Sequence, residues 1–196
     1  MSHFNSLAKD GLWCCLGFLT LGFEHILTGY DHLLFLLTLL MLGGNLRYLL
    51  KVVTAFTLAH SITLSLAVLN LITLSPRLVE SGIALSIAYV AAENIWQSQE
   101  KAARWRWLLT FVFGLIHGMG FAGMLQDLDV GGSSLVASLI SFNLGVELGQ
   151  LIVVSAAFSL LQMVKRIPWE LAFRRAVSGS AALMGLFWFM QRAFLF

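Results

Sequence analysis

Six blocks of mainly apolar residues dominate the chain, and each is long enough to cross a lipid bilayer. A transmembrane helix needs about 20 such residues to cross a hydrocarbon core of about 30 Å. With 59% hydrophobic and 11% charged residues, the chain is too apolar for a soluble domain. The pattern predicts an all-α polytopic membrane protein. The blocks cover residues 11–44, 46–72, 78–96, 105–125, 134–164 and 176–196.

The first block is too long for one crossing. As a single helix its 34 residues would measure about 51 Å. Gly29 is a natural place for this helix to end, because glycine adopts the left-handed conformation found just after helices. A division at Gly29 predicts about seven transmembrane helices, and six remain the alternative.

Positive charge predicts the orientation of these helices. With seven spans, ten Lys and Arg side chains lie on the side of the N-terminus and two on the other. Cytoplasmic connections are enriched in Lys and Arg, so we expect the N-terminus in the cytoplasm and the C-terminus outside. Six spans would move only Lys9 across. The first span lacks the pattern of a cleaved signal peptide and is expected to stay as an anchor.

No linker, repeat or low-complexity tract divides the sequence, so residues 1–196 are expected to form a single transmembrane domain. The adjacent Cys14 and Cys15 lie inside the first apolar block, where packing is a better interpretation than a disulfide. The Lys and Arg residues form no contiguous patch, so no nucleic-acid partner is expected. A homo-oligomer remains open.

Polar side chains inside the apolar blocks are the candidate functional residues. Ionisable groups at membrane depth are costly and usually have a partner or a task. His60 lies about 20 Å into its span, at 1.5 Å per residue. His117 lies at a similar depth, Glu147 lies near the middle of its span, and the remaining three flank the outer turn between the first two spans. All of them can therefore converge in the outer half of the membrane. The candidates are His25, Asp31, His32, His60, His117 and Glu147.

Imidazoles accompanied by carboxylates are usual ligands of Ni²⁺, Co²⁺, Zn²⁺ or Cu²⁺. His25 and His32 share a helix face but would be about 10 Å apart along a straight axis. A break at Gly29 would fold them towards one ion, whereas a continuous helix would place them in two sites. Each histidine could instead make a structural hydrogen bond between helices.

Further polar residues follow helical spacing around these candidates. Ser61 continues a stripe on the third span that also contains Thr54 and Thr57, and Asn143 precedes Glu147 by one turn. Outer acidic residues, which include Asp31, form a rim that would attract cations. The other rim residues are Glu80, Asp127 and Asp129.

Two GxxxG segments, at 114–118 and 145–149, predict close packing of the fifth and sixth spans, with His117 opposite Glu147. Glu93 and Asn94 lie near the cytoplasmic end of the fourth span. There, Glu93 is either an interfacial carboxylate or an inner waypoint for a departing cation.

Several segments together resemble the HupE/UreJ family of small membrane proteins, regarded as nickel or cobalt permeases. They are HILTGYDHLLFLL, FTLAHSITLSLA, VESGIALSIAYVAAEN, FGLIHGMGFAG and FNLGVELGQL. The resemblance implies that the six candidates handle the metal, with Glu93, Asn94 and Asn143 in support. Some members of the family have a proline where this chain has Ile26. This difference bears on the geometry of the turn after His25 and not on the family resemblance.

The expected function is therefore a permease that takes up Ni²⁺ or Co²⁺ across the inner (plasma) membrane of a bacterium. The alternative is an intramembrane zinc-dependent hydrolase, in which three histidines leave a fourth position for water. Asp31, Glu147 or Ser61 would then serve as acid, base or substrate-positioning group. Bis-histidine haem is a third use of such histidines.

Overall fold

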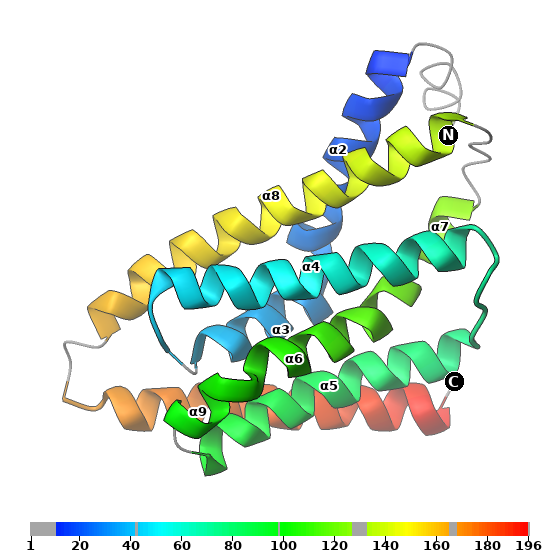
Figure 1. The fold of residues 1–196 in the computed structure, drawn as a ribbon. Coiled ribbons are helices and arrows are strands. Elements are labelled where there is room, and N and C mark those ends of the chain that lie inside the picture. Colours follow the sequence, from blue (N-terminus) through cyan, green and yellow to red (C-terminus); the bar gives the residue numbers. More distant parts are fainter. Residues whose placement is uncertain (1–10, 42, 98, 127–132, 165–167, 196) are drawn as a thin grey trace.

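The computed structural model describes residues 11–41, 43–97, 99–126, 133–164 and 168–195 (Figure 1). Within these ranges the chain is helical and has no strand, which confirms the predicted all-α class. The helices are α2 (Gly11–Thr28), α3 (Tyr30–Met41), α4 (Leu46–Val68), α5 (Pro76–Trp96), α6 (Gln99–Met119), α7 (Ala122–Gln126), α8 (Ser133–Val164), α9 (Glu170–Met190) and the π-helical turn η1 (Gln191–Leu195).

Local sequence explains where the central helices begin. The Asn45 side chain accepts a hydrogen bond of 2.8 Å from the Tyr48 amide and so caps α4. Gly43 and Gly44 have positive φ just before this cap, a conformation that favours glycine. Ser75 caps α5 in the same way, with Pro76 in the first turn, where its missing N–H costs nothing.

Paired contacts fix the relative direction of the helices. Cys14 lies 3.5 Å from Ser138 near the starts of α2 and α8, and Gly149 packs against Ile26 further along both, so these helices run parallel. Figure 1 shows α4 running against α8, and α9 running against α5.

Contacts at both ends of α3 give its direction relative to α5. Asn94 donates to the Thr38 carbonyl, and Arg192 bonds both Asp31 and Glu80, so α3 runs parallel to α5. As a result α2, α3, α5 and α8 point one way, whereas α4, α6 and α9 point the other (Figure 1).

The first apolar block is interrupted at Gly29, as predicted, but in a different manner. Hydrogen bonds from Gly29 N–H to His25 (2.9 Å) and from Leu33 N–H to Gly29 (3.0 Å) cross the break. Gly29 does not have positive φ, so the expected left-handed cap is wrong. Since α2 and α3 run in the same direction, they form one interrupted path. The two antiparallel crossings that seven spans require are not seen in the described helices.

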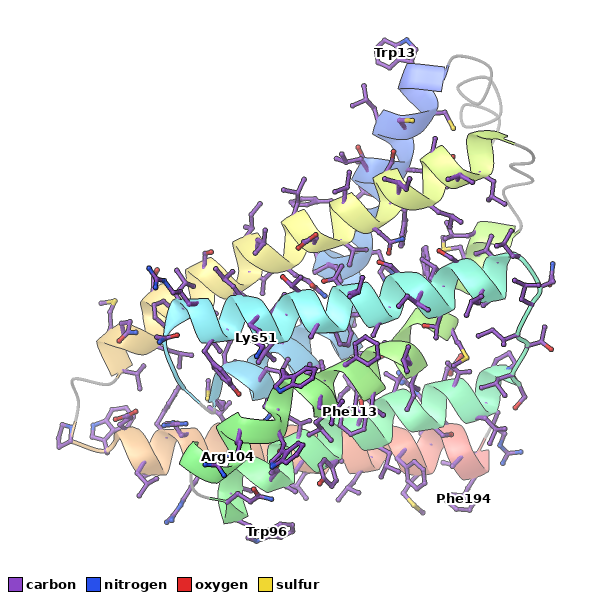
Figure 2. The ribbon with its side chains drawn as sticks, in the orientation of Figure 1. Trp13, Lys51, Trp96, Arg104, Phe113 and Phe194 are labelled. Atoms are coloured by element: carbon purple, nitrogen blue, oxygen red, sulfur yellow. The ribbon has the colours of Figure 1, made fainter. Side chains whose placement is uncertain are left out.

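Three helices in the described ranges are long and apolar enough to cross a membrane, namely Leu46–Val68, Pro76–Trp96 and Leu135–Val164. The apolar stretches Trp13–Thr28 and Tyr30–Met41 are shorter. Large apolar side chains, Phe113 and Phe194 among them, project along the helices (Figure 2). Many of these side chains are exposed, as expected for helices surrounded by lipid.

Both GxxxG segments make close helix contacts, but with other partners than predicted. Gly114 and Gly118 face the backbone of α4, where a Cβ on Gly114 would lie 2.6 Å from the Phe56 oxygen. Gly145 faces the Leu19 carbonyl of α2. The expected packing of the fifth span on the sixth is therefore wrong, because each groove receives a helix that carries a histidine, α4 or α2. Consequently His117 does not face Glu147 through these glycines.

We predict that Gly118→Ala destabilises the protein by about 2 kcal/mol, because its Cβ would collide with the His60 carbonyl and the Thr63 hydroxyl. Gly179→Ala in α9 is the control, since a Cβ there meets nothing within 4 Å. Thermal unfolding of the purified protein in detergent should show a lower midpoint only for Gly118→Ala. Equal midpoints for the two variants would contradict the close packing of α4 and α6.

Candidate metal site

Three imidazoles from three helices meet in the interior. His25 comes from the last turn of α2, His32 from the first turn of α3, and His60 from the middle of α4. Each offers a ring nitrogen, and these atoms all lie within 4.8 Å of one another. The ring centroids of His25 and His32 are 4.6 Å apart. We call these three residues the histidine cluster.

The interruption at Gly29 makes this approach possible. A Cβ at Gly29 would lie 2.7 Å from the His25 carbonyl oxygen and 3.0 Å from Nδ1 of His32. The absent side chain therefore leaves the space that the His32 ring needs. On a straight helix the two residues would be separated by about 10 Å along the axis.

Four of the six ring nitrogens of the cluster are buried without a hydrogen-bond partner. Nε2 of His25, Nε2 of His32 and both nitrogens of His60 are buried without one. A buried polar group left unpaired costs about 1–3 kcal/mol, so such groups need an explanation. Neutral imidazole is a good ligand for late first-row divalent cations. The donor set thus fits such a cation.

His117 lies beside the cluster, with its ring centroid 5.2 Å from that of His32. Its Nε2 is 3.0 Å from the Ser86 hydroxyl, which donates to the Ile83 carbonyl at 2.7 Å. Because the hydroxyl has only one proton, Ser86 accepts from Nε2–H, and the lone pair of His117 is on Nδ1. That atom is buried without a partner. The sequence pattern did not identify Ser86, although it lies in one of the family-like segments.

Aromatic rings cover one side of the imidazoles. Three phenylalanines each lie three or four residues, or about one helical turn, from a histidine of the same helix. All three are displaced from their histidine in the same direction, towards the end of the bundle where α3 and α5 finish. They are Phe35 on α3, Phe56 on α4 and Phe113 on α6. The Phe35 and Phe56 centroids are 5.2 Å apart, and both lie about 5 Å from His117, at 5.0 and 5.1 Å. We call these three residues the aromatic floor; it borders the histidine cluster on the side where α3 and α5 end.

The predicted carboxylates are not part of the cluster. Asp31 is paired with Arg192 at 3.1 Å. Glu147 lies 3.5 Å from the Thr54 hydroxyl instead. Within the described residues, neither carboxylate belongs to a group with metal-binding distances.

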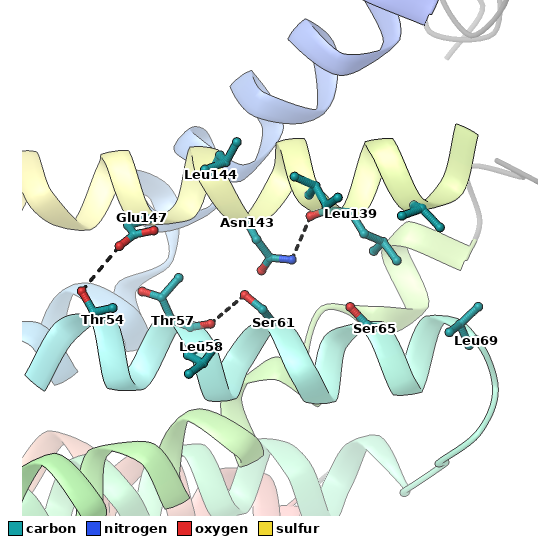
Figure 3. A pocket seen from close by; sticks show the side chains of 12 residues that line it. Thr54, Thr57, Leu58, Ser61, Ser65, Leu69, Leu139, Asn143, Leu144 and Glu147 are labelled. Atoms are coloured by element: carbon teal, nitrogen blue, oxygen red, sulfur yellow. Dashed lines mark hydrogen bonds between the residues drawn. The ribbon is translucent and has the colours of Figure 1, made fainter. Parts of the chain in front are cut away.

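Glu147 lines a cavity of about 460 Å³ between α4 and α8. Figure 3 shows Asn143 and Glu147 of α8 pointing towards Thr54, Thr57 and Ser61 of α4. The two polar stripes expected from the sequence therefore face each other. Leucine and isoleucine side chains complete the wall, so the cavity is mainly apolar with a polar strip.

Arg106 organises a second polar group. It is 1% exposed, and its Nη2 lies 3.0 Å from Glu93 and 2.9 Å from Asn94. Asn94 in turn donates to the Thr38 carbonyl at 2.7 Å. In this conformation Glu93 is therefore paired with Arg106 and is not a lipid-facing interfacial carboxylate. Its role as an inner waypoint for the cation stays a prediction. Sequence reasoning had counted Arg106 only as a connection charge.

We predict that Gly29→Ala weakens metal binding about tenfold, because the new methyl group displaces the His32 ring. Titration of the purified protein with Co²⁺ should show the change, and the unfolding midpoint should also fall, because the methyl group meets the His25 carbonyl oxygen at 2.7 Å. Gly179→Ala serves again as the control and should bind Co²⁺ like the parent. Parent-level affinity in Gly29→Ala would contradict the role given to the interruption.

Comparison with known proteins identifies the family. The family model described as HupE / UreJ protein matches residues 6–192, nearly the whole chain. No match was found among curated proteins or solved structures. The match agrees with the segments that resemble this family and with the helical, apolar architecture. The chain therefore belongs to the HupE/UreJ family, a family of membrane nickel and cobalt transporters.

Proposed function

We propose that this protein is a permease that takes up Ni²⁺ or Co²⁺ through an intramembrane site formed by His25, His32 and His60. The observation that carries the proposal is the convergence of their ring nitrogens within 4.8 Å, buried and largely unpaired. Membership of a transporter family supports it. The metal ion is the cargo, and the bilayer is the other partner.

The composition of the histidine cluster suits transport better than permanent storage. Three neutral imidazoles replace part of the water shell of the ion, but no carboxylate of the cluster offsets its charge. A transported ion must bind well enough to enter and weakly enough to leave. Nδ1 of His117 offers a fourth donor next to His32, which would let the ion exchange ligands as it moves.

The hydrolase alternative has less support. It needs an acid or base beside an open position on the metal. Asp31 is held by Arg192, and Ser61 donates to the Thr57 carbonyl at 2.7 Å. Glu147 lies with Thr54 in the cavity between α4 and α8. These contacts and the family both favour the permease.

We further propose six crossings, in which α2 and α3 together form the first. Nine Lys and Arg residues then lie on the side where α4 begins, and three lie on the other side. The positive side, near Lys51 and Arg104 in Figure 2, faces the cytoplasm. Both chain ends face outside, and the proposed location is a bacterial inner membrane.

This topology predicts the outcome of reporter fusions. Reporters placed before Gly11 and after Phe196 should both report the outside, and one inserted between α5 and α6 should report the cytoplasm. Alkaline phosphatase and a fluorescent protein, active on opposite sides, provide the two readouts. If the reporter before Gly11 lies in the cytoplasm while the one after Phe196 lies outside, the six-span topology is wrong and seven spans are supported.

We predict that His32→Ala, His60→Ala and the double variant all lose most of the bound metal, with little further loss in the double. Ligands of one ion act as a unit, so their removal is not additive. Metal analysis of purified protein and Ni²⁺ or Co²⁺ uptake by intact cells are the measurements.

Gln150→Leu is the matched control, since Gln150 is fully buried and bonded to Thr57 at 2.6 Å but carries no imidazole. It should keep the parent metal content. Parent-level metal in both single histidine variants would refute the common site.

A further inference from the structure

A partly buried ion pair lies at the outer end of the histidine cluster. Arg192, in η1, bonds Asp31 at 3.1 Å and the Glu80 carbonyl at 3.4 Å. Asp31 directly precedes His32 of the histidine cluster. A guanidinium therefore lies between the imidazoles and the end of the bundle where α9 finishes.

A second ion pair stands at the inner end. Thr38, which Asn94 bonds, lies six residues after His32 and so about 9 Å further along α3. Arg106 and Glu93 meet there at 3.0 Å, with the guanidinium 1% exposed. The aromatic floor lies between this pair and the imidazoles. A cation leaving the cluster inwards would meet the floor first and then Arg106.

Both arginines oppose the passage of a divalent cation. Like charges repel strongly where water is excluded, so an ion and a guanidinium cannot share one end of the path. Each arginine nevertheless rests on a carboxylate that would attract the ion once the arginine has moved. Each pair also joins two different elements: η1 and α3 outside, α6 and α5 inside.

We infer that Arg192 and Arg106 are displaceable gates that close the two ends of the metal path. Arg192 leaves Asp31 when an ion arrives from outside, and Arg106 leaves Glu93 when the ion departs inwards. With both pairs formed, as in this conformation, each end of the path holds a guanidinium. This inference rests on the proposed function, because it concerns the path to and from the same cluster.

The test measures how fast bound Co²⁺ leaves the purified full-length protein after addition of excess EDTA. Arg192→Gln and Arg106→Gln should each release Co²⁺ at least about tenfold faster than the parent, with unchanged Co²⁺ content at saturation. Arg192→Lys and Arg106→Lys keep the charge and should release it slowly. Release at the parent rate from both glutamine variants overturns the gates.

Two other arginines provide matched controls at the same ends. Arg77 donates to the Ala193 carbonyl near the outer pair, and Arg174 pairs with Glu170 at 3.6 Å near the inner end. Arg77→Gln and Arg174→Gln should release Co²⁺ at the parent rate. Equal acceleration in these controls would overturn the gates by showing a general loosening of the bundle.

Membrane vesicles of known orientation assign each gate to a side. Bound Co²⁺ in Arg192→Gln should become accessible to EDTA added outside right-side-out vesicles. In Arg106→Gln it should become accessible in inside-out vesicles. The reverse assignment overturns the proposal.

A lone Arg106→Gln change leaves a buried carboxylate without a partner and can impair folding. The double variant Glu93→Gln/Arg106→Gln removes both charges and should fold while releasing Co²⁺ as fast as the single variant. One pair of results separates this inference from the proposed function. If His32→Ala loses its metal but Arg192→Gln and the Glu93→Gln/Arg106→Gln double variant release Co²⁺ at the parent rate, the gates are refuted. The proposed function then still stands. A parent protein that binds no Co²⁺ refutes both.

Discussion

The interruption of the first apolar block at Gly29 is the constraint on which the site depends. It holds two histidines seven residues apart with their ring centroids 4.6 Å from each other, although both helices run the same way. The arrangement is maintained by separate neighbours, since α2 packs in parallel on α8 through glycines and α3 packs on α5. Had α2 and α3 been one straight helix, His25 and His32 would face different depths of the bilayer.

The histidine cluster combines two properties that oppose each other. Four of its six ring nitrogens are buried and unpaired, which favours a cation, yet the formal charge of the cluster is zero and Arg106 and Arg192 nearby are positive. A site with a carboxylate among its ligands would retain a divalent ion more firmly. The separation of imidazoles from carboxylates is therefore consistent with an ion that binds in passing. It also explains how Asp31 and Glu93 can be paired with arginines and not with the ion.

Sequence reasoning predicted the helical class, the interruption and the residues that meet at it, because hydropathy and spacing along one chain determine these features. His60 was placed by depth alone, and depth is readable from its distance to a span end. The partners of Arg106 and Arg192 were not readable, since Asp31 and Arg192 lie 161 residues apart. Hydropathy also gives the length of a span but not its direction, so α2 and α3 were first separated into two crossings. The glycines of α6 and α8 indicated close packing without indicating which helix they would receive.

The central claim is that one ion is held by the imidazoles of His25, His32 and His60. X-ray absorption spectroscopy at the metal edge of the Ni²⁺- or Co²⁺-loaded protein tests it most directly. The structure predicts about three imidazole ligands, recognised by the multiple scattering of their rings, with metal–nitrogen distances near 2.0–2.1 Å as for other imidazole complexes. A shell of oxygen atoms without imidazole scattering would contradict the claim and would indicate that carboxylates bind the ion instead.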